Sequence, residues 1–430
     1  MAAMQSPLRS LNNIRPLLRG RLPGQLVIQY SNRCNADCPQ CGMRRSEKIA
    51  RSTLDKDHVK NLIDNAAEKG IKSLSFTGGE PLIFLDDIVE LTNHASAAGI
   101  PYVRTGTNGF IFRDSESLDF ENKISRIAEK LAGTKLYTFW ISLDSAEPGD
   151  HEAMRGLAGV VRGIEKALPI FHTHGIYPSV NLGINRATGG RLKQPFLRSS
   201  GEDEFLAAFK DSFARFYQLV HNLGFTIVNA CYPMSSAPAT DAAVSTDLQT
   251  SLYGAASSDS IITFSEKEKA LIFRALYETI PEYRGKLRIF SPRCSLYSLI
   301  RKFGEQRTPL FPCRGGADFF FVECEKGKIH PCGYREEPVD ELPDLATRFG
   351  KIVDCDKCEW ECFRDPSDVL GPFADLFSQP FKLAGKIINE PHFFRLLIED
   401  LRYYRACGYF NGRIAPQTKA MQRFALSPAC

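Results

Sequence analysis

The sequence predicts an α/β protein in which a parallel β-sheet with covering helices is followed by a small cysteine-rich module. Between Gln25 and Phe290, short apolar segments alternate about six times with longer segments of helical periodicity. This order is typical of parallel strands joined by right-handed helical crossovers. Cysteines gather at the start of this region and again after its end. The chain has 430 residues, which suits one large domain of roughly 250 residues and a smaller one.

The expected elements follow one another regularly. Strands are expected at 25–30, 71–76, 102–107, 138–143, 179–184 and 225–230. Helices are expected at 56–69, 85–98, 119–132, 160–172 and 204–223. The stretch 232–260, rich in Ser, Ala, Pro and Thr, is expected to be a long loop near a substrate site. Periodicity alone does not decide whether such a sheet is open or closed into a barrel.

The remainder of the chain predicts a hairpin and a helical tail. Apolar residues at 318–322, a turn at 325–327 and residues 328–331 form the expected hairpin, with a cysteine on either side. Helical spacing continues through Phe393, Leu396, Leu397 and Leu401. The Phe-rich tail has two interpretations: core packing, or a peripheral contact with a membrane or an apolar substrate.

Composition excludes several classes of protein. The net charge of +4 is too small to indicate nucleic-acid binding, and no apolar run reaches the roughly 18 residues of a spanning helix. The first 24 residues carry four arginines and no acidic residue, but no apolar segment follows them as in a signal peptide. We therefore expect a basic arm on a cytoplasmic protein. In a reducing compartment, its 13 cysteines favour metal sites over disulfides.

The first cysteine group lies directly after the first expected strand. Cys34, Cys38 and Cys41 have the spacing C-x3-C-x2-C, and no fourth cysteine lies nearby. Four thiolates normally hold an iron–sulfur cubane, so three indicate a cluster with one iron open to another ligand. The alternative is a zinc knuckle, although zinc sites usually combine two closely spaced pairs.

This arrangement resembles the radical S-adenosylmethionine (SAM) superfamily, and later motifs extend the resemblance. Residues 76–81 (FTGGEP) follow the second strand and match the superfamily's GGE motif, so Gly78, Gly79 and Glu80 are implied to receive the SAM amino group. Asn108 ends the third strand, where a polar SAM contact is common. Ser142 and Asp144 end the fourth, and by resemblance they meet the ribose and carboxylate of SAM. Gln40 stands where the superfamily usually has an aromatic residue beside adenine.

The resemblance implies a partial (β/α)6 TIM-like barrel holding SAM and a [4Fe–4S] cluster. One electron, from a donor such as flavodoxin or ferredoxin, would split SAM into methionine and a 5′-deoxyadenosyl radical. That radical would remove a hydrogen atom from an unactivated carbon of the substrate. The protein's part is to orient that carbon and to exclude water.

The second cysteine group resembles the SPASM and twitch domains of radical SAM enzymes, which carry auxiliary [4Fe–4S] clusters. The implied metal ligands are Cys313, Cys332, Cys355, Cys358 and Cys362. The run C-x2-C-x3-C departs from the SPASM pattern, so one auxiliary cluster on the first four fits better than two. Cys324 and Cys362 are then spare thiols, and Cys407 is a further candidate that would reach this group from the tail. A zinc ribbon is the alternative.

Other polar residues have both a functional and a structural interpretation. Cys231, at the end of the sixth strand, has the position of a catalytic hydrogen-atom donor to a substrate radical, or it is a small buried apolar residue. Asn181, Asn185 and Arg186 either contact SAM or substrate, or are ordinary polar residues at a strand end. His151 is expected to be structural rather than a general base.

The expected function is hydrogen abstraction from a small molecule such as a sugar, an aminocyclitol or a lipid precursor, leading to oxidation, epimerisation or carbon–carbon bond formation. The alternative is a peptide- or protein-modifying maturase, and an iron–sulfur sensor or electron carrier is the non-enzyme class. We expect four segments: a basic arm (1–24), the barrel (25–290), the auxiliary cluster domain (291–365) and a helical tail (366–430).

Overall fold

The computed structural model describes residues 16–41, 51–191, 194–197, 201–234, 259–305, 307–335, 337–345, 355–356 and 358–425. Most of the expected loop at 232–260 lies outside these residues. No helix in these ranges is both long and apolar enough to cross a membrane.

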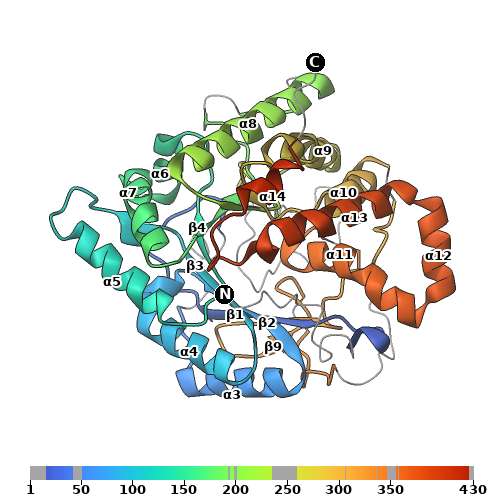
Figure 1. Ribbon diagram of the computed structural model, residues 1–430, viewed down its shortest axis with the longest axis horizontal. Helices are drawn as coiled ribbons and strands as arrows, with labels where there is room; N and C mark the ends of the chain where they lie inside the picture. Colours follow the sequence, from blue (N-terminus) through green and yellow to red (C-terminus); the bar gives the residue numbers. More distant parts are fainter. Residues whose placement is uncertain are drawn as a thin grey trace.

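A single sheet organises the described part of the chain (Figure 1). The strands run in the order β7-β6-β5-β4-β3-β2-β1-β8-β9, and all neighbouring pairs are parallel except β8 and β9. Their bounds are β1 Gly24–Ser31, β2 Ile71–Gly78, β3 Tyr102–Thr107, β4 Thr138–Ser142, β5 Ser179–Gly183, β6 Ile227–Cys231, β7 Arg288–Ile289, β8 Phe319–Val322 and β9 Ile329–His330. The predicted α/β class and its parallel sheet are confirmed.

Helices follow the strands as predicted and lie around the outside of the sheet (Figure 1). The bounds are α3 Lys56–Glu68, α4 Leu85–Ala97, α5 Phe120–Ala132, α6 Pro148–Arg155, α7 Val160–Thr173, α8 Glu202–Leu223, α9 Glu266–Tyr283 and α10 Arg293–Gly304. The C-terminal helices are α11 Glu361–Ser378, α12 Pro380–Asn389, α13 Pro391–Ala406 and α14 Thr418–Gln422. The expected elements did not include α6 and β7, which are short, or the longer helices α9 and α10.

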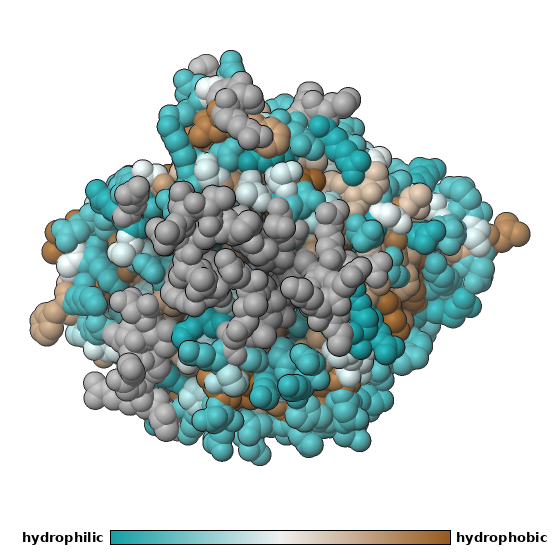
Figure 2. Space-filling model, turned by 180° about the vertical axis from the view of Figure 1, so that it is seen from behind, coloured by the Kyte–Doolittle hydropathy of each residue, from teal (hydrophilic) through white to brown (hydrophobic). Residues whose placement is uncertain are grey.

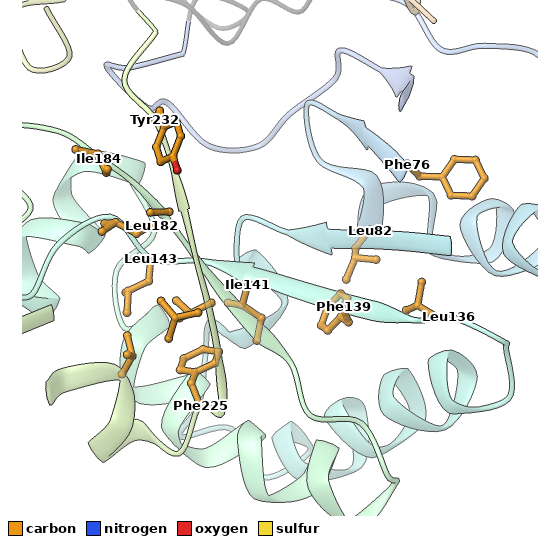
Figure 3. Close-up of a cluster of buried hydrophobic side chains, with 14 of the residues drawn as sticks. Phe76, Leu82, Leu136, Phe139, Ile141, Leu143, Leu182, Ile184, Phe225 and Tyr232 are labelled. Carbon is orange, nitrogen blue, oxygen red and sulfur yellow. The ribbon is translucent and has the colours of Figure 1, made fainter. Parts of the chain in front are cut away.

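Alternation along the strands separates an apolar outer face from a more polar inner face. Outward side chains such as Phe139, Ile141 and Leu182 are buried against the helices, as Figure 3 shows. Inward side chains one position away, such as Arg104, Trp140 and Asn181, line a cavity instead. The sheet therefore curves around a lumen in the manner of a partial barrel.

The cysteine-rich segment is continuous with this sheet rather than separate from it. Strand β8 pairs in parallel with β1, and Val27 lies opposite Phe321. The predicted hairpin is present as β8 and β9. Helix α11 runs across the expected boundary between 365 and 366, so no break between elements occurs there.

The Phe-rich tail divides between core and surface. Phe393 is buried in a cluster with Phe311, Leu396 and Leu397, whereas Phe381 on α12 is 92% exposed. Core packing therefore explains α13 but not α12. On the face shown in Figure 2, hydrophilic side chains predominate in the described part and hydrophobic ones form small groups.

Candidate functional site

The first cysteine loop lies at the carboxyl end of β1 and is tied to the loop after β2. The N–H of Gly79 donates to Ser31 O (2.7 Å), and the N–H of Glu80 donates to Arg33 O (2.9 Å). Within the loop, the N–H of Ala36 approaches Cys34 Sγ at 3.5 Å. The three thiols are close enough for Cys34 and Cys41 to affect the pKa of Cys38. Local sequence spacing and the strand edge thus bring these cysteines together.

The two glycines of the GGE motif allow the close approach of these loops. A Cβ on Gly78 would overlap the backbone oxygen of Ser31, and a Cβ on Gly79 would lie 2.5 Å from the carbonyl carbon of Arg33. Sequence reasoning attributed the glycines to the approach of a ligand. The structure gives a different reason, which is contact between two protein loops.

The carboxylate of Glu80 is engaged by backbone groups of the protein itself. Its side chain is buried and accepts hydrogen bonds from the N–H groups of Leu82 (3.0 Å) and Asn108 (2.6 Å). Burial raises its pKa to about 7, against the lowering effect of these donors. Glu80 therefore fixes the loops after β2 and β3 relative to each other, and direct contact of its carboxylate with a cofactor stays a prediction.

Asn108 connects the loop after β3 to the cysteine loop. Its Nδ2 donates to Asn35 Oδ1 (2.8 Å) and approaches Cys34 Sγ at 3.5 Å. Its Oδ1 accepts from the N–H of Phe110 (2.9 Å). The residue predicted to contact the cofactor therefore lies beside a predicted ligand of the cluster.

Asp144 is the centre of a buried network after β4. It accepts hydrogen bonds from Gln40 Nε2 (2.8 Å), from Arg155 Nη2 (2.7 Å) and Nε (2.9 Å), and from the N–H of Gly183 (3.1 Å). Gln40 thus uses the position of the usual aromatic residue to attach the cysteine loop to β4. Ser142, two residues earlier, faces the lumen.

Four further polar residues have different surroundings. Asn181 lines the lumen, whereas Asn185 donates to Asp144 O (2.8 Å) and Gly183 O (2.7 Å). Arg186 forms a buried ion pair with Glu268 (2.9 Å), so its functional interpretation is not supported. His151 is structural, as predicted: its Nδ1 accepts from the N–H of Asp144 (3.1 Å), and burial lowers its pKa to about 3.

A cavity of about 610 Å³ fills the lumen. Its upper rim, at the carboxyl ends of the strands, includes Gln40, Ser142, Asp144, Arg155 and Cys231. Aromatic side chains form much of the wall, among them Trp140 from β4, Phe319 from β8 and Trp360 and Phe373 next to or on α11. At the opposite end, Tyr137 donates to Tyr409 O (2.8 Å), and Tyr409 and Phe410 line the bottom.

Two thiols and a carboxylate meet at the upper wall of this lumen. Cys231 ends β6, Cys362 belongs to the first turn of α11, and Glu361 lies between them. Cys362 Sγ lies 3.6 Å from Glu361 Oε1, and the N–H of Tyr232 donates to Glu361 Oε2 (3.2 Å). Burial raises the pKa of both thiols well above the usual value, so both are protonated. This placement argues against the predicted role of Cys362 as a metal ligand.

The other four C-terminal cysteines form a separate group. The N–H of Cys313 donates to Cys355 O (3.1 Å). Cys332 interacts electrostatically with Cys313 and Cys355, and Cys358 does so with Cys313 and Cys332. Cys332 Sγ also lies 3.4 Å from the N–H of Tyr334. The fold therefore gathers the four cysteines that sequence analysis favoured for one cluster.

The remaining candidate thiols lie elsewhere. Cys324 accepts from the Ser52 hydroxyl (3.3 Å), beside β1 and α3. Cys407 packs in a cluster with Ile227, Tyr403 and Phe410. The idea that Cys407 reaches the C-terminal cysteine group from the tail is therefore wrong.

Residues 28–185 match the family model of the Radical SAM superfamily. The chain contains a radical SAM domain. The match begins inside β1 and ends just after β5, so it includes the cysteine loop and every motif at the strand ends described above. The chain is therefore an enzyme of a superfamily that uses SAM and a [4Fe–4S] cluster.

Curated relatives agree with this assignment. An AdoMet-dependent heme synthase of Methanosarcina barkeri is 21% identical over 350 residues, which cover 79% of this chain and 87% of that protein. A probable GTP 3′,8-cyclase of Pyrococcus abyssi is 30% identical over 172 residues, or 39% of this chain and 50% of the cyclase. The match to the cyclase thus spans only half of its length.

A solved structure with a similar arrangement is that of Streptococcus suis SuiB bound to S-adenosylmethionine. It has a TM-score of 0.47 and 16% sequence identity, and the match covers 72% of this chain and 60% of SuiB.

The residues of the radical SAM domain fit a [4Fe–4S] cluster that is held by three cysteines and has one iron open to another ligand. Three thiols lie in one loop, and Cys34 Sγ already has two N–H groups within 3.5 Å, the kind of donor that surrounds cluster sulfurs. Gln40 Oε1 is buried beside them without a hydrogen-bond partner among the described residues. In the described ranges, no three His, Cys, Asp or Glu side chains converge as ligands of one ion would. Ligands of a cluster bind different irons, so their sulfurs need not converge.

Proposed function

We propose that this radical SAM enzyme acts on a small molecule bound in the barrel lumen. The observation that carries the proposal is the lumen itself, whose volume of about 610 Å³ is typical of small-molecule sites. Tyr409 and Phe410 line its far end, and residues of α11 contribute to one wall. Two of the relatives, a heme synthase and a GTP cyclase, are by their names enzymes of small molecules.

The rim residues hold the cofactors in place above the substrate. When bound, the cluster on Cys34, Cys38 and Cys41 and SAM supply a 5′-deoxyadenosyl radical that removes a substrate hydrogen atom. The backbone of Gly78 and Gly79, with Glu80, Asn108, Ser142 and Asp144, forms the proposed SAM site. Gln40 and Arg155 keep the Asp144 carboxylate oriented.

Cys231 is the proposed hydrogen-atom donor to the substrate radical. Its thiol faces the lumen and is protonated at neutral pH because burial raises its pKa. A neutral thiol can give up a hydrogen atom, whereas a thiolate cannot. The thiyl radical left behind takes one electron and one proton, with an external reductant such as flavodoxin or ferredoxin as the electron source.

We further propose an auxiliary [4Fe–4S] cluster on Cys313, Cys332, Cys355 and Cys358. The interactions among these four side chains support one such cluster, and Cys362, Cys324 and Cys407 have other neighbours, namely Glu361, Ser52 and Tyr403. Zinc bound to the same four thiols is the competing occupant, and it requires their sulfurs to converge on one ion, which no three such side chains do among the described residues.

The test is anaerobic reconstitution followed by measurement of 5′-deoxyadenosine with dithionite as reductant. We expect about eight irons per chain, and about four with no 5′-deoxyadenosine when Cys34, Cys38 and Cys41 are all replaced by alanine. A small-molecule extract should stimulate 5′-deoxyadenosine formation before and after treatment with peptidases. Stimulation that peptidases abolish would favour the peptide-modifying alternative, and zinc in place of four irons would remove the auxiliary cluster.

A peripheral membrane contact is a secondary proposal, and it rests on α12. Phe381 and Ile388 are 92% and 77% exposed on this helix, and Lys382 lies beside Phe381 in sequence. Amphipathic helices with exposed apolar and basic side chains bind anionic membranes. Co-sedimentation with anionic vesicles, lost in a Phe381→Ser and Ile388→Ser double variant, is the expected result.

A further inference from the structure

Arg104 points from β3 into the lumen without a partner. It occupies an inward position, opposite Ser75 on β2 and Thr138 on β4. Its side chain makes no hydrogen bond or ion pair with any residue that the structure describes, and its Nε is buried without an acceptor. It lies three residues before the end of β3, or about 10 Å below the cysteine loop at 3.3 Å per residue.

Each of the other buried arginines of the described chain has at least one side-chain partner, although some of them also keep a buried nitrogen without one. Most form ion pairs with a buried carboxylate, as do Arg155, Arg186, Arg284, Arg314 and Arg364. Arg288 lacks such a partner but donates to the backbone oxygens of Asn411 (3.1 Å) and Ile414 (3.0 Å). Arg104, which is half-buried with a buried Nε, belongs to neither group, although a desolvated charge without a partner is costly.

The acidic groups of the lumen cannot supply the missing partner because each is engaged elsewhere. Asp144 pairs with Arg155 (2.7 Å). Glu361 accepts from the N–H of Tyr232, and Asp365 accepts from the hydroxyls of Ser295 (2.7 Å) and Tyr232 (3.2 Å). The groups that interact with Arg104 electrostatically are the side chains of Cys362 and Tyr137, which burial keeps neutral by raising their pKa values.

The surroundings of Arg104 are aromatic. Gly106, two residues along β3, leaves space for the ring of Trp140, which a Cβ at that position would overlap. Phe319 and Trp360 contribute to the same wall. A ligand that suits this lumen therefore has an apolar body and one anionic group.

We propose that Arg104 binds the anionic group of the substrate, and that the substrate is an amphipathic carboxylate or phosphate. The guanidinium offers a planar fork of donors that matches either group in bidentate geometry. This inference rests on the proposed function, because it assumes that the lumen is the substrate site. It narrows that proposal to a chemical class.

Tryptophan fluorescence can report ligand binding in the lumen. It has two tryptophans, Trp140 and Trp360, and both line the cavity. Intrinsic fluorescence of the reconstituted enzyme with SAM therefore reports occupancy directly. The ligands to titrate are octanoate, octyl phosphate and the neutral analogue octanamide.

We expect the wild-type enzyme to bind an anionic ligand roughly ten- to hundredfold more tightly than octanamide, the range for hydrogen bonds to a charged group. Arg104→Gln should remove this preference for anions. Arg104→Lys should retain part of it, because lysine keeps the positive charge but lacks the planar pair of guanidinium donors. Arg162→Gln is the matched control, since Arg162 lies on the exposed face of α7 and pairs with Glu165. The stronger of the two anions indicates whether the natural group is a carboxylate or a phosphate.

Three outcomes would overturn the inference: equal affinity of wild type for octanoate, octyl phosphate and octanamide, an anion preference that survives in Arg104→Gln, or no fluorescence response to either anion. If Arg104→Gln fails to fold by circular dichroism, Arg104→Lys must still show the intermediate preference. Failure of the proposed function is distinguishable, because it appears as absence of 5′-deoxyadenosine in the wild type. An active wild type without an anion preference refutes only the role of Arg104.

Discussion

The contact between the GGE loop and the cysteine loop makes Gly79 the most informative position in the radical SAM domain. A Cβ on Gly79 would lie 2.5 Å from the carbonyl carbon of Arg33, whereas ordinary contact begins at 3.4 Å. The carbonyl oxygen of Arg33 would be closer still, so the Gly79→Ala variant must move the two loops apart by at least about 0.9 Å. This displacement strains two interloop hydrogen bonds, Gly79 N–H to Ser31 O and Glu80 N–H to Arg33 O.

The expected cost follows from these contacts. Each lost hydrogen bond costs about 1 kcal/mol, and overpacking adds about 1–3 kcal/mol. The free energy of unfolding should thus fall by about 3–5 kcal/mol in urea titrations followed by circular dichroism. Because the displaced segment carries Cys34, reconstituted iron should fall from about eight to about four per chain.

A matched control separates this steric effect from a general effect of replacing glycine. Gly149 also has an ordinary backbone conformation, but nothing lies within 4 Å of a Cβ placed there. Gly149→Ala should leave stability and iron content unchanged or slightly improve stability. A Gly79→Ala variant with the stability and iron content of Gly149→Ala would refute the reasoning.

Three other predictions concern the buried network and the C-terminal cysteines. Arg155→Met leaves the Asp144 carboxylate buried without its cation, so the free energy of unfolding measured in urea should fall by about 3–5 kcal/mol. In the control variant Arg162→Met, which breaks an exposed ion pair, it should fall by no more than about 0.5 kcal/mol. Similar losses in the two variants would contradict the proposed importance of the buried network. In the folded state the pKa of His151 is about 3, so His151 stays neutral as the pH falls from 6.5 to 5. In the unfolded state the same side chain gains a proton over this range. The free energy of unfolding should therefore fall by about 1.5 kcal/mol between pH 6.5 and 5. That pH-dependent part should disappear in His151→Gln, and its persistence would assign it to other groups. The iron content should fall from about eight to about four atoms per chain when alanine replaces Cys313, Cys332, Cys355 and Cys358. It should stay near eight when alanine replaces the two other thiols, Cys324 and Cys407. Loss of iron in this second variant would show that the proposed ligand set is wrong.

The sequence alone predicted the architecture because its signals are local. Strand and helix periodicities depend on neighbours within one segment, and the predicted strand at 102–107 matches β3 at both ends. The same holds for Cys34, Cys38 and Cys41, because one short loop at a strand end carries all three. The hairpin of β8 and β9 was also predictable from its turn residues.

Tertiary structure decided which distant residues meet. The segment 355–362 contains three cysteines, yet Cys355 and Cys358 lie with Cys313 and Cys332 while Cys362 turns to the lumen beside Cys231. Spacing could not separate them, because the first turn of α11 sets the direction of Cys362.

The role of Arg104 depends on packing for the same reason. A sequence shows an arginine in an apolar strand, but it does not show whether a carboxylate from another element lies opposite. In this fold, Asp144, Glu361 and Asp365 are each engaged by groups far away in sequence, and Arg104 is left facing the cavity. Local pattern thus determined the scaffold and the cluster loop, whereas long-range packing determined the chemistry of the lumen.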